Sequence, residues 1–291
     1  MSSRPIYRFA PSPNGPLHLG HALSALTGFE MARRANGRFL VRIEDIDTVR
    51  CKPELVAAVF DDLAWLGIEW QQPVMHQSQR FDVYAEAAAQ LRAAGLLYPC
   101  FATRAEIQAA AVPGAIDPDG APLYPGLHRN LSPNDIRARR EAGQPYALRI
   151  DMQRAVARAR EILRGAPLTF TELDESADSA DIEIIPADAE AWGDAVIVRK
   201  DVPASYHLAV VIDDAAQGVT HVTRGRDLFR ATGLHRLLQV LLGLPAPVYH
   251  HHRLLTDAEG RKLAKSAGDI GLATLRADGV TAGEVRRLCG F

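Results

Sequence analysis

Hydrophobic and polar residues follow two different periods near the start of the chain, and these periods predict its first elements. The stretches from Ile6 to Ala10 and from Arg38 to Ile43 have the composition and alternation of strands. Between them a helical face repeats at a spacing near 3.6 and consists of Ala22, Ala25, Leu26, Phe29 and Ala32. A strand, a helix and a second strand in this order predict a parallel sheet covered by helices.

The rest of the chain continues this mixture of elements. Helices are expected from Pro53 to Leu66, from Arg80 to Ala94 and from Leu234 to Leu242, each followed by a glycine. Strands are expected at Tyr146 to Asp151, at Ala195 to Arg199 and at Thr220 to Thr223, and a short helical tail at Ala273 to Phe291. The apolar run from Ser205 to Asp214 predicts a central strand with Tyr206 at its entrance.

The loop after the first strand is the first candidate for chemistry. Arg8 to His21 reads R-F-A-P-S-P-N-G-P-L-H-L-G-H, and its prolines prevent regular structure until Gly20 opens the helix. A helix N-terminus favours anions such as phosphate, and His18 and His21 would lie there on one side as hydrogen-bond donors. Gly20 would let a nucleotide approach the backbone. The alternative is a proline-rich loop with two surface histidines.

A second motif far along the chain changes this picture. Lys262 to Ser266 reads K-L-A-K-S, and with H-L-G-H at His18 to His21 the chain resembles the class I aminoacyl-tRNA synthetases, which carry HIGH and KMSKS motifs. The lead-in R-F-A-P-S-P-x-G resembles the glutamyl and glutaminyl branch. Over nearly the whole chain the resemblance is greatest to the short glutamyl-queuosine tRNA(Asp) synthetases. Small-molecule nucleotidyltransferases also carry H-x-G-H, but they lack the second motif at this distance.

This resemblance implies an α/β fold with three regions. A Rossmann-like catalytic domain with a parallel sheet would occupy residues 1–97 and 192–245 as two halves. An inserted α+β domain of the kind that binds a tRNA acceptor stem would occupy residues 98–191, where prolines and glycines become frequent. Residues 246–291 would hold the K-L-A-K-S loop and a short helical region, with no anticodon-binding domain after Phe291.

The resemblance also implies which residues bind the substrates. The expected catalytic residues are His18, His21, Lys262 and Lys265, and ATP would be bound by His18, Gly20, His21 and Lys265. Glutamate would be bound by Arg8, Phe9, Ala10, Pro11, Ser12, Glu44, Tyr206 and Arg224. Glu44 would pair with the α-amino group and Arg224 with a carboxylate. The alternatives are a solvated acidic turn for Glu44 and a core position for Tyr206.

The implied reaction is the ATP-dependent formation of glutamyl-adenylate, with Mg2+ as the counter-ion of ATP, followed by transfer to the queuosine base of tRNA(Asp). Two alternatives stay open: a glutamyl-tRNA synthetase fragment that charges a tRNA 3′ end, and a non-catalytic paralogue that binds tRNA or senses an amino acid. Clustered arginines from Arg137 to Arg164 suit contact with RNA phosphates or form a solvated basic face.

A zinc site is a further possibility in the inserted region. The resembled family holds zinc there with a C-x-C pair and a later Y-x-x-x-C, whereas this chain has Cys100, Tyr124 and His128, and Ala102 replaces a ligand. Three donors fall short of the four that a structural zinc requires. We therefore expect less than one equivalent of zinc. His250, His251 and His252 are not expected to bind one ion, because neighbours in an extended segment face opposite ways.

Composition sets the remaining expectations. Of 291 residues, 47% are hydrophobic and 23% charged, which is ordinary for a globular protein, and the formal net charge of -2 argues against wholesale binding of nucleic acid. No run is long enough to span a membrane or to serve as a signal peptide. Cys51, Cys100 and Cys289 lie far apart, which fits a reducing compartment. We therefore expect a cytoplasmic protein and a monomer.

Overall fold

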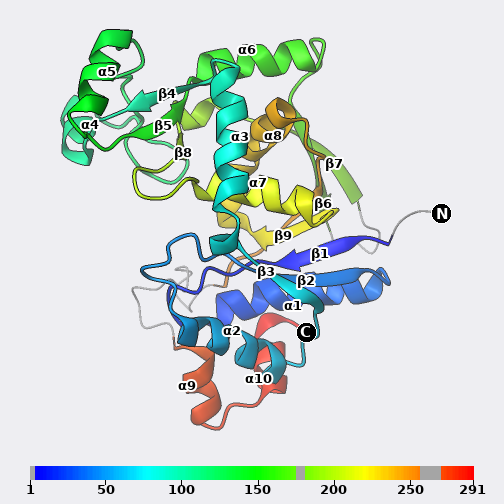
Figure 1. Ribbon diagram of the computed structural model, residues 1–291. Coiled ribbons are helices and arrows are strands. Elements are labelled where there is room, and N and C mark those ends of the chain that lie inside the picture. Colours follow the sequence, from blue (N-terminus) through cyan, green and yellow to red (C-terminus); the bar gives the residue numbers. More distant parts are fainter. Residues whose placement is uncertain (1–3, 175–180, 256–269) are drawn as a thin grey trace.

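A computed structural model describes residues 4–174, 181–255 and 270–291. Its main element is a seven-stranded sheet in the order β3-β2-β1-β9-β10-β6-β7 (Figure 1). These strands are β1 (Ile6–Phe9), β2 (Arg38–Ile43), β3 (Gln71–His76), β6 (Thr169–Asp174), β7 (Asp181–Pro186), β9 (His221–Gly225) and β10 (Val248–His252). All neighbouring pairs are parallel except β6 and β7. The predicted parallel sheet is therefore confirmed.

The middle of this sheet is the place where a ligand is expected. The chain goes from β1 to β2 on one side, whereas β9 pairs with the other side of β1. In such sheets ligands bind outside the carboxyl ends of the strands, at the point where the strand order reverses. Arg8 in β1, Glu44 after β2 and Arg224 in β9 all lie at these carboxyl ends.

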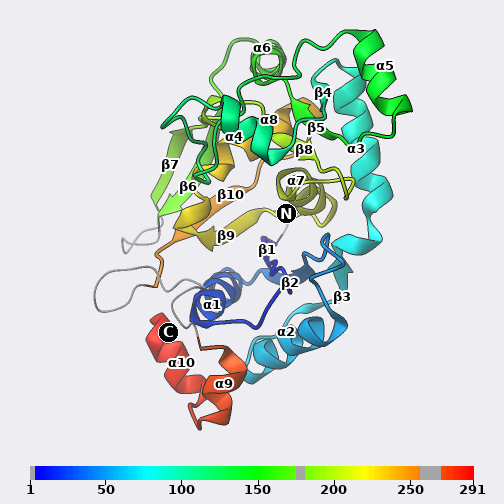
Figure 2. The same cartoon turned by 90° about the vertical axis from the view of Figure 1, so that its left-hand side faces the viewer.

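One face of the sheet is covered by an apolar layer of helices. α1 (Leu19–Arg34) and α2 (Pro53–Trp65) lie on this side, and α10 (Ala282–Cys289) and α9 (Leu272–Ala277) pack against α1 and α2, as Figures 1 and 2 show. Their shared core contains Phe9, Val41, Leu26, Leu63 and Val285. Phe9 therefore lies on the face of β1 opposite to Arg8, because successive side chains of a strand alternate.

The other face meets α3 (Phe81–Ala93), α7 (Tyr206–Ala216) and α8 (Ala231–Leu242), which share a second apolar core (Figure 1). Ser205–Asp214 was expected to be a central strand, and this expectation is wrong, because Tyr206–Ala216 forms α7. The Ser205 side chain accepts a hydrogen bond from the N–H of Leu208 and so caps the helix. A short apolar run has the same pattern in a buried helix and a buried strand, and its β-branched residues favoured the strand.

A smaller antiparallel sheet lies beside α3 and α7. It consists of β4 (Leu97–Cys100), β5 (Ala147–Ile150) and β8 (Val196–Val198). The expected strand at Ala195 to Arg199 exists as β8, but it pairs with β5 and lies outside the large sheet. α4 (Arg104–Ala110), α5 (Pro133–Glu141) and α6 (Met152–Ile162) belong to the same region. Conversely, β6 and β7, which fall within residues 98–191, extend the large sheet.

Helices in the described part of the chain are all too short or too polar to cross a membrane.

Candidate active site

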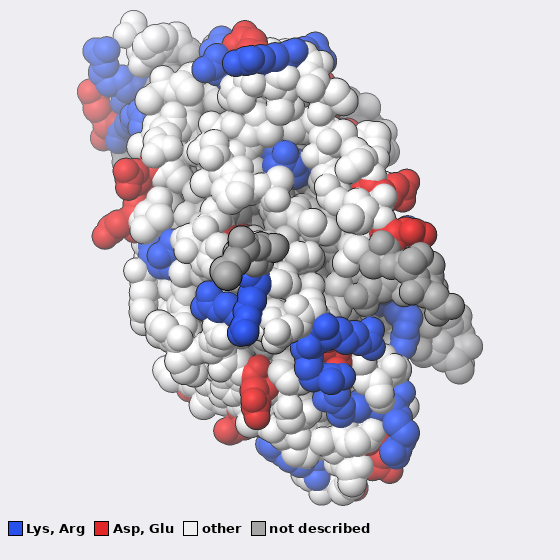
Figure 3. All heavy atoms as spheres, turned by 90° about the vertical axis from the view of Figure 1, so that its right-hand side faces the viewer, with Lys and Arg blue, Asp and Glu red and all other residues white. Residues whose placement is uncertain are grey.

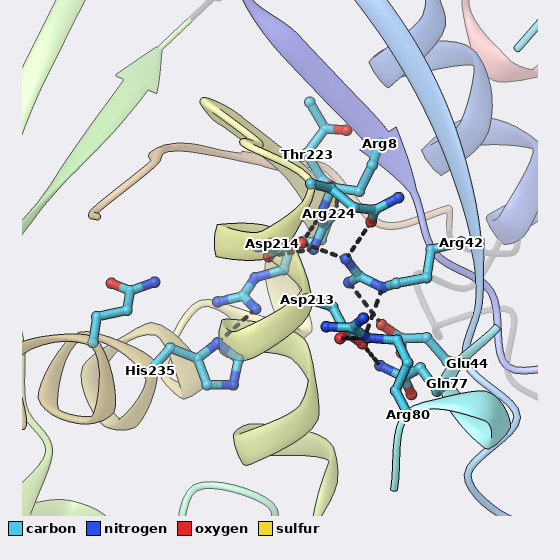
Figure 4. A network of polar contacts seen from close by, with 12 residues as sticks. Arg8, Arg42, Glu44, Gln77, Arg80, Asp213, Asp214, Thr223, Arg224 and His235 are labelled. Carbon is cyan, nitrogen blue, oxygen red and sulfur yellow. Dashed lines mark hydrogen bonds and ion pairs between the residues drawn. The ribbon is translucent and has the colours of Figure 1, made fainter. Parts of the chain in front are cut away.

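A layer of buried charges separates β1 and β2 from α7. Arg8 Nε lies 3.0 Å from Asp214 Oδ1, and Arg42 Nη1 lies 2.7 Å from the same oxygen. Arg42 Nη2 is 3.0 Å from Glu44 Oε1, so Glu44 is joined to Arg8 through two charged side chains (Figure 4). All four side chains are buried. Glu44 is therefore part of an ordered site, and the alternative of a solvated acidic turn is wrong.

Asp213, the neighbour of Asp214 on α7, belongs to a second part of this layer. Its carboxylate accepts hydrogen bonds from Gln77 Nε2 at 2.8 Å, from Arg80 Nε at 2.7 Å and from the Tyr84 hydroxyl at 2.7 Å. Gln77 and Arg80 come from the segment between β3 and α3, and Tyr84 lies in α3. The two aspartates thus fix α7 to β1, β2, α3 and the segment before α3 (Figure 4).

The charges in this layer set the ionisation of its carboxylates. Burial alone would raise the pKa of Asp214, but Arg8 and Arg42 outweigh it and hold this pKa below its ordinary value. Burial raises the pKa of Glu44, although Arg42 and Arg8 act in the opposite direction. The protein thus stabilises the charge of Glu44 less than that of Asp214, so a bound cation such as an ammonium group would lower the pKa of Glu44 again.

Arg224 is buried in a different environment. Its guanidinium donates to His251 Nε2 at 3.1 Å, to His235 Nδ1 at 3.1 Å and to Thr232 Oγ1 at 2.6 Å. No carboxylate among the described residues contacts it, in contrast to Arg8 and Arg42. Burial, followed by the charge of Arg224, lowers the pKa of His235, so this ring is neutral. Arg224 is accordingly a buried cation that needs an anion.

Tyr206 connects these groups at the start of α7. Burial raises the pKa of its hydroxyl, which also experiences the charges of Arg224, Glu44, Arg8 and Asp214. Its ring centroid lies 5.6 Å from that of His235. The fold therefore brings Arg8, Glu44, Tyr206 and Arg224 to one place, although they lie far apart in the sequence.

Tyr206 also lines a cavity of about 530 Å³ between α7 and the region of the smaller sheet. The walls contain aromatic rings from Tyr124 and Trp192, and charged side chains from Arg149, Arg199 and Asp117. A cavity of this volume with aromatic and polar walls is large enough for a nucleobase.

The histidine loop forms the N-terminus of α1. His18 is the N-cap, its Nδ1 accepts from the N–H of Gly20 at 3.1 Å, and His21 Nδ1 accepts from the N–H of His18 at 3.2 Å. Since Nδ1 of each neutral ring is an acceptor, the proton of each ring is on Nε2. A Cβ on Gly20 would lie 2.9 Å from His18 Cε1. A side chain at position 20 would therefore displace the ring that caps the helix.

The other residues of this loop lie close to the same layer. The carbonyl oxygen of Pro11 accepts from the N–H of Glu44 at 2.9 Å, and Ala10 and Pro11 link β1 to the loop. Ser12 is exposed. Farther along, Leu17 accepts a backbone hydrogen bond from Leu272 at 2.7 Å, which ties the loop to the start of α9. Lys262 and Lys265 lie outside the described residues.

The three candidate zinc donors, Cys100, Tyr124 and His128, are hydrogen-bonded within the protein. Cys100 Sγ lies 3.3 Å from the Tyr124 hydroxyl, which accepts from the N–H of His128 at 2.8 Å. His128 Nδ1 accepts from the N–H groups of Phe101 and Ala102, both at 3.1 Å. Ala102 is buried and has no donor atom. This donor set does not fit a tetrahedral zinc ion, and the described residues contain no cluster of three His, Cys, Asp or Glu suited to a metal.

The three consecutive histidines of β10 have separate partners. His251 Nδ1 lies 2.8 Å from Glu172 Oε2, whereas His252 Nε2 lies 3.1 Å from Ser24 Oγ on α1. His250 Nδ1 lies 2.8 Å from the carbonyl oxygen of Leu173. The extended conformation predicted for this segment is confirmed, and it sends the rings in different directions.

The clustered arginines are in part engaged within the protein. Arg158 pairs with Glu161 at 2.8 Å, and Arg154 pairs with Asp151 at 3.3 Å. Arg140 lies 4.7 Å from the centroid of the Tyr146 ring. Figure 3 shows basic side chains along the top edge of one face, where α6 lies, and a second group in its lower half. Contact of these arginines with RNA stays a prediction.

Comparisons with known proteins show the family of this chain. The family model described as tRNA synthetases class I (E and Q), catalytic domain, matches residues 6–282. The chain belongs to the class I tRNA synthetases. Its relatives include the Glutamyl-Q tRNA(Asp) synthetase of Rhodobacter capsulatus, which is 48% identical, with 98% of this chain and 100% of the relative aligned. The corresponding protein of Symbiobacterium thermophilum is 41% identical over 94% of this chain and 82% of its own length.

Solved structures agree on the synthetase fold. A glutamate-tRNA synthetase from Elizabethkingia anophelis superposes with a TM-score of 0.70 at 28% identity, over 92% of this chain. This chain spans about half of that protein, namely 54% of its length. The expected fold and the expected class of enzyme, a ligase of the aminoacyl-tRNA synthetase type, are therefore confirmed.

Sequence reasoning missed several residues of this candidate site. Arg42 was noticed only as a residue of a strand, and Asp213 and Asp214 as the end of an apolar run. A signal was present, because two adjacent acids that end a run of buried residues must find cationic partners. His235 had no such signal, because it is a single histidine on α8, and His251 was considered only as part of the run from His250 to His252.

Proposed function

We propose that this synthetase activates L-glutamate with ATP and transfers the glutamyl group to the queuosine base of tRNA(Asp). The observation that supports the choice of amino acid is Arg224, a buried guanidinium whose protein partners among the described residues are all uncharged. Two of its five N–H groups remain for a ligand, and they suit a carboxylate in a bidentate contact. The choice of acceptor is supported by the two Glutamyl-Q tRNA(Asp) synthetases, which are 48% and 41% identical.

In this proposal the amino acid lies between β1, β9 and the start of α7. Its side-chain carboxylate pairs with Arg224 and accepts a hydrogen bond from the Tyr206 hydroxyl. Its α-amino group pairs with Glu44 and stabilises the charge of that carboxylate. Arg8 borders the same space and is held in place by Asp214. Ala10, Pro11 and Ser12 form the nearby edge of the pocket, whereas the Phe9 side chain supports β1 from the opposite face.

The chemistry requires no covalent enzyme intermediate. An oxygen of the glutamate α-carboxylate attacks the α-phosphorus of ATP, the bond to the bridging oxygen breaks, and pyrophosphate leaves. A hydroxyl group of the acceptor then attacks the carbonyl carbon of glutamyl-adenylate, loses its proton and displaces AMP. His18 and His21 stabilise the phosphate charge through Nε2–H, and Lys262 and Lys265 add positive charge.

Magnesium enters this scheme with ATP, because Mg2+ is usually held by substrate phosphates and water together with few protein oxygens. The acceptor base would enter through the cavity of about 530 Å³ that Tyr206 lines. From there its hydroxyl group would reach the activated carboxyl group at the start of α7.

Two measurements test the proposal. Glutamate-dependent exchange of pyrophosphate into ATP without RNA reports amino-acid activation, and we expect it with glutamate but not with glutamine. Charging of tRNA(Asp) with and without queuosine then identifies the acceptor, and we expect a product only with queuosine. Exchange without any charging would reject the acceptor, charging at a 3′ end would favour a glutamyl-tRNA synthetase activity, and absence of both would indicate a non-catalytic paralogue.

A further inference from the structure

The environment of Arg224 differs from that of the other buried arginines. Arg8 and Arg42 each contact a carboxylate within 3.0 Å, so the protein itself compensates their charges. Arg224 donates to two imidazole nitrogens and one hydroxyl oxygen, which come from α8 and β10. The protein therefore fixes the direction of this guanidinium while leaving its charge uncompensated by any described residue.

The hydrogen bonds also determine which ring nitrogens carry protons. A guanidinium only donates, so His235 Nδ1 must accept, and the proton of the neutral ring is on Nε2. That Nε2 lies 3.1 Å from His207 Nδ1, which must then be the acceptor. His235 is in this way held between Arg224 and His207, and a His235 ring that was protonated, or neutral with its proton on Nδ1, would present N–H to the cation.

The second imidazole is held in the same manner. His251 Nε2 accepts from Arg224 Nε at 3.1 Å, so its proton is on Nδ1 and is donated to Glu172 Oε2 at 2.8 Å. Glu172 also accepts from the N–H of His251 at 2.8 Å. The neutral His251 ring thus lies between the Glu172 carboxylate and Arg224.

We propose that His235, supported by His207, is a specificity-determining positioning residue of the amino-acid site. It orients Arg224 without neutralising it, so that the site binds a carboxylate side chain and rejects the carboxamide of equal size. This inference rests on the proposed activation of glutamate. An aspartate in place of His235 would keep an acceptor beside Arg224 but would supply the negative charge that the substrate normally brings.

The test is pyrophosphate exchange with three variants of one position. We expect His235→Leu to raise the KM for glutamate about 10-fold or more, as loss of a hydrogen bond to a charged group implies, and to change the KM for ATP little. His235→Asn should restore most of the glutamate affinity, because its amide oxygen replaces Nδ1. His235→Asp should reduce the preference for glutamate over competing glutamine by about 10-fold or more.

His221→Asn is a matched control, because His221 lies on the strand of Arg224 but contacts Tyr7 and Thr220. His207→Leu should raise the KM for glutamate less than His235→Leu does, since it acts through His235. An unchanged KM for glutamate in His235→Leu, or equal rises for glutamate and ATP, would overturn the inference.

The two isosteric variants keep the test decisive if His235→Leu does not fold. Equal discrimination between glutamate and glutamine in His235→Asn and His235→Asp would also overturn the inference. Failure of the proposed function has a different signature, because the unmodified protein would then show no glutamate-dependent exchange at all.

Discussion

Asp214→Asn tests whether the buried charge layer holds the catalytic region together. The substitution keeps the size of the side chain but removes the charge that Arg8 Nε and Arg42 Nη1 share at 3.0 and 2.7 Å. Arg42 is fully buried, so its guanidinium cannot reach water when this charge is removed. Removing one partner of a buried ion pair costs about 3–5 kcal/mol.

A loss of about 3–5 kcal/mol is a large part of the 5–15 kcal/mol that stabilises a typical domain. Urea unfolding followed by circular dichroism measures it, and an unchanged denaturant slope would show that the folded state keeps its compactness. Asp47→Asn is the control, because Asp47 pairs at 2.7 Å with the largely exposed Arg50 and should lose at most about 1 kcal/mol. Equal losses for the two variants would refute the reasoning.

Three further predictions concern ligand, acid and metal. Arg224→Leu should weaken glutamate binding by about 2–5 kcal/mol and ATP binding far less, because it leaves the bound carboxylate unpaired; calorimetric titration of both ligands checks this, and equal losses would contradict it. Burial lowers the pKa of His207 and of His251 to about 4, below the ordinary 6.5. The unfolded chain therefore takes up protons first, so stability should fall as the pH falls from about 6.5 to about 4, by up to roughly 3 kcal/mol per ring; urea unfolding at several pH values would show a smaller fall in His207→Asn, and an equal fall would argue against this cause. The purified protein should hold well under one zinc per chain by elemental analysis, and Ala102→Cys with His128→Cys should raise that content and make stability sensitive to chelators; about one zinc in the unmodified protein would contradict this prediction.

The first strands and helices could be predicted from the sequence because local pattern decides them. β2 has the predicted bounds, Arg38–Ile43, and α2 and α3 end within one residue of the predicted ends. The run at Ser205 to Asp214 failed because burial on all sides removes the periodicity that separates helix from strand. The pairing of β8 with β5 could not be predicted either, since strand partners depend on contacts far apart in the sequence.

The candidate site could likewise be predicted only in part. The resemblance to the synthetase family implied Glu44, Tyr206 and Arg224, and the fold places them together with Arg8. The residues that hydrogen-bond to them were not predicted, because the role of a lone histidine such as His235 depends on which residues the fold places beside it.

The histidine cap of α1 has a consequence for mutagenesis of the proposed phosphate site. His18 uses Nδ1 to cap the helix and has its proton on Nε2, so one ring has a folding role and a proposed binding role. An alanine there would remove both, since loss of an N-cap alone costs about 1 kcal/mol. Asparagine is also a good N-cap but has no counterpart of Nε2. His18→Asn is therefore the variant that separates the two roles, and a stable but inactive His18→Asn protein would assign the loss to phosphate binding.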